Sequence, residues 1–79
     1  MSERHYRYTL VLDPDPEVGG YTVTVPALPG VVTQGETREE AITMGREAIR
    51  CHIEGLLADG ENVPEEREPP SIVTVEISP

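Results

Sequence analysis

The segment Gly20–Ala41, GYTVTVPALPGVVTQGETREEA, constrains the fold most, because it contains strand, corner and helix-start signals in close succession. Its first part, Tyr21–Val25, alternates apolar residues with threonine, which is typical of a strand with one packed and one solvated face. Pro26 cannot donate to a strand ladder, so it should end this strand. Pro29-Gly30 then predicts a turn. The segment therefore predicts two short strands joined by a fixed corner.

A helix is predicted directly after the second of these strands. Gly35 should give the backbone freedom there, and Thr37 followed by Glu40 is a capping-box pattern that opens a helix over about residues 38–59. Gly60 stands where a left-handed C-terminal cap is expected. The predicted sheet-facing stripe of the helix comprises Ala41, Gly45, Ala48, Ile49, His52, Ile53 and Leu56.

The remaining elements complete a single domain over residues 1–79. Strands are expected at about residues 6–12, 21–25, 31–34 and 72–77, with a Pro- and Gly-rich hairpin turn at 13–20 and a charged, proline-rich linker at 61–70 that should not pack. The expected fold class is α+β: a β-β-β-α-β two-layer sandwich with one long helix on one face. A right-handed crossover gives sheet order 3-2-1-4.

Composition narrows the possible classes of protein. Seventy-nine residues form only a modest core, and Cys51 is the single cysteine, so neither an intramolecular disulfide nor a zinc site can supplement it. A homo-oligomer is the expected supplement. No stretch approaches the ~20 apolar residues of a membrane span, so a soluble, cytoplasmic protein without membrane contact is expected.

The sequence offers little for catalysis, and we expect neither an enzyme nor a cofactor. Asp13 and Asp15 are paired carboxylates at a strand end, but a metal-dependent nuclease needs acids within strands, and turn formation explains both. His52 has no nucleophile or paired acid placed for it and should be a partly buried structural residue. Cys51 should be an inert, at least half-buried thiol. No phosphate-binding loop or metal-ligand pattern is present.

The string G-Y-x-V-x-V-P-x-L-P-G-x-x-T-x-G-x-T-x-E-E-A resembles the HicB family of antitoxins, and the match continues into the helix and into Gly60–Pro64. The resemblance implies a partial RNase H-like fold without nuclease carboxylates. It also implies a protein that binds and caps HicA, a small basic mRNA-cleaving toxin. The motif positions expected to be structural are Gly20, Tyr21, Pro26, Pro29, Gly30, Gly35, Thr37, Glu40, Gly60 and Pro64.

Two departures from the family pattern limit what the resemblance implies. Many members carry a C-terminal DNA-binding domain, whereas this chain ends directly after its expected fourth strand and resembles a short form, so operator binding is not carried over from the family. Val31 stands where the family often has cysteine, so that position should serve packing.

The charge balance agrees with a basic partner. Fifteen acidic residues against six arginines give a net charge of −9, which disfavours direct nucleic-acid binding and attracts cationic surfaces. The alternative is a freestanding, oligomeric structural or ligand-binding relative without a toxin. The acids expected to face a partner are Asp13, Asp15 and Glu17 in the first hairpin and Glu36, Glu39 and Glu40 at the helix start.

Overall fold

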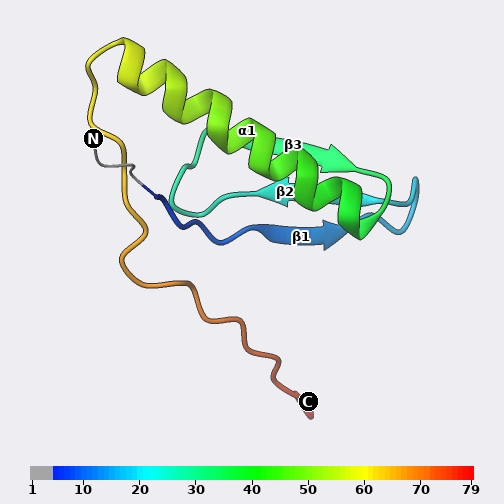
Figure 1. Cartoon of the computed structure of the whole chain (residues 1–79). Coiled ribbons are helices and arrows are strands. Elements are labelled where there is room, and N and C mark those ends of the chain that lie inside the picture. Colours follow the sequence, from blue (N-terminus) through cyan, green and yellow to red (C-terminus); the bar gives the residue numbers. More distant parts are fainter. Residues whose placement is uncertain (1–4) are drawn as a thin grey trace.

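The computed structural model describes residues 5–79 and confirms the α+β class: a three-stranded antiparallel sheet is covered on one face by a single helix (Figure 1). The strands are β1 (Val11–Pro14), β2 (Tyr21–Thr24) and β3 (Val32–Gly35), and the helix is α1 (Arg38–Ala58). β2 is the central strand, with β1 and β3 as its antiparallel neighbours.

The alternation predicted for β2 is confirmed. Val23 and Val25 are buried against α1, whereas Thr22 is exposed. The core is small, as expected for a short chain. Its central cluster comprises Val25, Leu28 and Val31, and Tyr8, Leu10, Ala48 and Ile49 pack against it.

The corner between β2 and β3 directs Leu28 into this core. The Leu28 amide donates to the Val25 carbonyl at 2.9 Å, and the Val31 amide donates to the Leu28 carbonyl at 2.9 Å. These two successive turns leave Leu28 only 1% exposed. A left-handed conformation at Gly30 is not found, and a β-carbon there would meet open space, so this glycine is not required by the local geometry.

The N-terminus of α1 is capped as the sequence predicts. The Glu40 amide donates to Thr37 Oγ1 at 3.0 Å, which satisfies one of the unpaired amides of the first turn. The reciprocal bond differs from a standard capping box, because Glu40 Oε1 accepts from the Glu36 amide at 3.3 Å instead of from Thr37. The two bonds together fix the connection from β3 into the helix.

Replacing Thr37 with alanine should lower the free energy of unfolding by about 1 kcal/mol, because the Glu40 amide loses its acceptor. The melting temperature should fall by roughly 4–8 °C for a domain of this size. Thr43→Ala is the matched control, since Thr43 is an exposed residue within α1 and alanine has the higher helix propensity. Equal melting temperatures for the two variants would contradict the capping role of Thr37.

The C-terminus of α1 also agrees with the sequence. Gly60 adopts the left-handed conformation with φ 71°, and its amide donates to the Leu57 carbonyl. Two expectations on the helix are wrong: His52 is exposed and not part of the sheet-facing stripe, and Cys51 is an exposed free thiol. Beyond residue 50, Ile53 is the one buried residue of the helix and Leu56 is half-buried, because the helix crosses the sheet and its last turns extend beyond it (Figure 1).

The first strand is shorter and later than predicted. Residues 6–10 are not part of the sheet, because β2 turns away at Pro26, which cannot donate to a ladder. β3 begins one residue later than predicted, at Val32.

The predicted fourth strand is absent from the structure. Residues 72–77 pair with no strand, so the sheet has three strands in the order expected for them and lacks the fourth. The chain after α1 returns past residues 8 and 9, to which it is hydrogen-bonded, and then leads away from the sheet (Figure 1).

The linker was expected not to pack, and that prediction is wrong. The Thr9 amide and Thr9 Oγ1 donate to the two carboxylate oxygens of Glu66 at 2.8 and 2.7 Å, and the Tyr8 hydroxyl donates to the Pro64 carbonyl. Burial raises the pKa of Tyr8, helped by the nearby Tyr6, Glu65 and Glu66, so the phenol keeps its donor proton at neutral pH. Because Pro26 has no amide to donate, the ladder between β1 and β2 stops before Thr9, and the Thr9 amide and hydroxyl donate to Glu66 instead.

Candidate partner-binding surface

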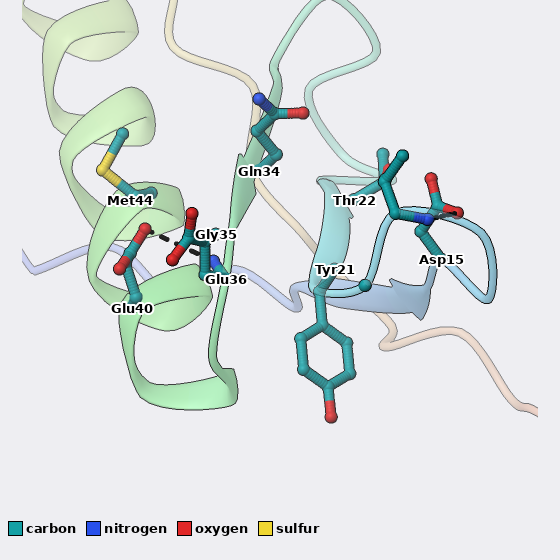
Figure 2. Close-up of a pocket in the computed structure, with 10 residues that line it drawn as sticks. Asp15, Tyr21, Thr22, Gln34, Gly35, Glu36, Glu40 and Met44 are labelled. Atoms are coloured by element: carbon teal, nitrogen blue, oxygen red, sulfur yellow. Dashed lines mark hydrogen bonds between the residues drawn. The ribbon is translucent and has the colours of Figure 1, made fainter.

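One end of the molecule has a hollow of about 430 Å³, between the β1–β2 turn, the ends of β2 and β3, and the first two turns of α1 (Figure 2). We call this region the acidic hollow. The residues that line it are Asp15, Val18, Gly19, Tyr21, Thr22, Gln34, Gly35, Glu36, Glu40 and Met44.

The local sequence fixes the walls of the acidic hollow. Asp15 Oδ1 accepts from the amides of Glu17 at 2.9 Å and Val18 at 3.2 Å, which is an Asx-type turn. On the opposite wall the bond from the Glu36 amide holds the Glu40 carboxylate at the helix start (Figure 2). Both carboxylates are thus oriented by backbone amides of their own segments.

The structure brings together three of the acids predicted to face a partner. Asp15, Glu36 and Glu40 line the hollow, and no basic residue does. Because an acidic concavity focuses a negative potential, it attracts a cationic group and repels a phosphate. Acids in the first turn of a helix are also favourable in their own right, because they interact with the helix dipole.

The other three predicted acids lie outside the hollow. Asp13 is exposed on β1, opposite Thr22 in the β-ladder, and Glu17 is exposed in the hairpin turn. Glu39 is exposed in the first turn of α1. They add to the negative potential of the same end without forming the concavity.

Sequence reasoning missed the uncharged residues of the hollow. Met44 is 42% exposed on α1, and Tyr21 is half-buried at the start of β2. Their position gives the acidic hollow an apolar component, which a protein partner can bury. The i,i+4 spacing of Glu40 and Met44 on α1 was the available signal, since residues at that spacing share a helix face.

Within residues 5–79, no three or more His, Cys, Asp or Glu side chains are grouped so that they could hold a metal ion. No helix in that range combines the length and apolarity of a membrane span. The groups that the residues of the acidic hollow offer for binding are carboxylates, amide and hydroxyl groups, and a thioether.

Comparison with known proteins identifies the family of this chain. The family model for the HicB-like antitoxin of bacterial toxin–antitoxin systems matches residues 8–76. The chain belongs to the HicB-like antitoxin family. The matched range contains all three strands, α1 and the bonded linker.

Relatives of this HicB-like chain fall into two groups by length. A UPF0150 protein of Thermoplasma acidophilum is 48% identical over 58 residues, covering 73% of this chain and 83% of the relative. Antitoxin HicB 1 of Photorhabdus laumondii is 41% identical over 77% of this chain, and antitoxin HicB of Escherichia coli K12 is 38% identical over 73%. The chain spans only 39% and 41% of the lengths of these two antitoxins.

Proposed function

We propose that this chain is an antitoxin that binds a small basic HicA-type mRNA-cleaving toxin and neutralises it by covering its RNA-binding surface. The observation that carries the proposal is the match to the HicB-like antitoxin family over residues 8–76. The acidic hollow supports it, because a toxin that binds RNA must present a cationic surface. The protein acts by binding in this proposal, without chemistry of its own.

The physical basis of the proposed interaction divides between rate and affinity. A net charge of −9 steers a cationic partner toward the protein and makes association depend on salt. Charges at the rim of an interface contribute little to affinity, so the apolar part of the hollow, Tyr21 and Met44, is proposed to supply the buried contact.

A freestanding relative without a toxin is the second candidate. It is favoured by the UPF0150 relative, which is matched over 83% of its length and whose name states no antitoxin role. A gene for a small basic protein beside the gene for this chain would favour the antitoxin, and the absence of such a gene would favour the freestanding relative. Under the antitoxin proposal, expression of that basic protein alone should arrest growth. Its co-expression with this chain should restore growth, and the two proteins should co-purify.

Neutralising the acidic hollow should lower the rate of association with the toxin about tenfold at low salt. The variant carries Asp15→Asn, Glu36→Gln and Glu40→Gln, which keep the acceptors of the Asx turn and of the cap. The control carries Glu61→Gln, Glu65→Gln and Glu68→Gln, which remove the same charge from the linker. Stopped-flow mixing at several salt concentrations measures both, and equal rates for the two would refute the role of the hollow.

A further inference from the structure

The carboxyl-terminal segment has the composition of a strand but no strand partner. Ile72, Val73, Val75 and Ile77 are 81%, 75%, 69% and 79% exposed. Val73, Val75 and Ile77 alternate with Thr74 and Glu76, the period of a strand with one apolar face. Soluble monomers seldom expose so much adjacent aliphatic surface, so this segment is expected to be covered in the working protein.

The free edge of β1, together with residues 6–10 that lead into it, can accept such a strand; we call this the β1 edge. The Asp15 amide donates to the Gly20 carbonyl, on the β2 side, and backbone groups alternate in direction along a strand. Leu10 and Leu12 therefore direct their amides and carbonyls toward the free edge. Pro14, the next outward position, has no amide to offer, so the open stretch lies at residues 6–12.

The chain is already extended along this open stretch. The rings of Tyr6 and Tyr8 are stacked, with centroids 6.4 Å apart and an interplanar angle of 15°. That separation agrees with the roughly 6.6–6.8 Å between alternate residues of a strand. An added strand would therefore meet a backbone that needs little rearrangement.

A groove lies beside this edge on the helix side of the sheet. It has a volume of about 210 Å³ and is lined by Tyr6, Tyr8, Leu10, Ile42, Arg46 and Ile49. All but Arg46 are half-buried, so they are packed on one side and exposed on the other. A strand paired with residues 6–12 would place every second side chain in this groove.

Within one molecule, the linker that precedes residues 72–77 lies on the β2 side of residues 6–12 and not at their free edge. Thr9 lies an even number of residues before Asp15, so its amide points to the same side of the extended chain, toward β2. There it donates to Glu66. The linker near Glu66 also borders Pro26 and Ala27, at the end of β2. From there the chain leads away from the sheet to its carboxyl terminus (Figure 1).

We propose that residues 72–77 of one copy add as a fourth strand to the β1 edge of a second copy, and that the exchange is reciprocal and forms a dimer. Val73, Val75 and Ile77 then occupy the groove of the other copy. Thr74 and Glu76 fall on the outer face, which in this structure carries the exposed Arg7, so opposite charges share that face. The inference does not depend on the proposed toxin.

Light scattering after size exclusion tests the dimer. The full chain should have about twice its mass of 8.7 kDa at micromolar concentration. Val75→Asp should raise the dimer dissociation constant at least a hundredfold, because it places a charge in the apolar groove. Thr74→Asp is the matched control, with the same charge on the outer face, and should change it less than tenfold.

A mixing experiment tests the exchange itself. Ile42→Asp should damage the groove and, like Val75→Asp, give a monomer, with circular dichroism confirming that both variants are folded. Mixed together, the two should form a heterodimer, because the intact segment of the Ile42→Asp chain fits the intact groove of the Val75→Asp chain. A monomeric wild type, a Val75→Asp dimer, or no heterodimer on mixing would overturn the proposal. If Ile42→Asp does not fold, Arg46→Glu at the groove rim replaces it.

Discussion

Replacing Gly35 with alanine should destabilise the fold by about 3 kcal/mol or more, at the upper end of the cost of overpacking. A β-carbon on Gly35 would lie 2.6 Å from Ala41 Cα and closer still to the Ala41 amide nitrogen. These atoms belong to the first turn of α1, whose position is fixed by the Thr37 cap and by packing on β3. The contact can be relieved only by moving the helix from the sheet.

Gly30→Ala is the matched control for this variant. Its new β-carbon would meet open space, and its backbone is not left-handed, so the free energy of unfolding should change by less than about 0.5 kcal/mol. Urea denaturation followed by circular dichroism compares the two. A Gly35→Ala variant as stable as Gly30→Ala would show that the helix and sheet are not held in contact at this point.

The elements that the sequence predicts well are those with local causes. The helix over Arg38–Ala58 was expected within one residue, because Thr37, Glu40 and Gly60 act on amides and carbonyls within a few residues. The burial of Val23 and Val25 follows in the same way from the alternation of β2. Such signals do not depend on what the rest of the chain does.

The elements that the sequence predicts poorly depend on distant contacts. The alternation at residues 72–77 shows that a strand can form, but pairing requires an edge within reach. Glu66 appears in the sequence as one more linker acid, and only the structure shows it bonded to Thr9, 57 positions away. Gly30 and Gly35 look alike as glycines next to turns, and they differ only in what surrounds them.

The candidate site could be predicted only in part, because it too depends on contacts between segments that are distant in the sequence. Grouping acids by element named the hairpin and the helix start, and the structure places acids from both beside one hollow, because β2 and β3 bring these two ends together. Which acids turn toward the hollow depends on the Asx turn at Asp15 and on the bond from Glu36 to Glu40. Glu39, next to Glu40, lies outside the hollow because adjacent helix residues are on different faces.

Truncating Leu28 to alanine should lower the free energy of unfolding by about 2–5 kcal/mol, because Leu28 is 1% exposed at the centre of a small core. A chain of 79 residues is expected to have only about 4–12 kcal/mol in total, so a large share of its stability would be lost. Val32→Ala, at a 61% exposed residue of β3, should cost under about 0.5 kcal/mol, and Leu28→Met under about 1.5 kcal/mol. Urea denaturation measures all three variants. If Leu28→Ala is as stable as Val32→Ala, the Val25–Val31 corner does not hold the two layers together, and its prolines shape only a surface loop.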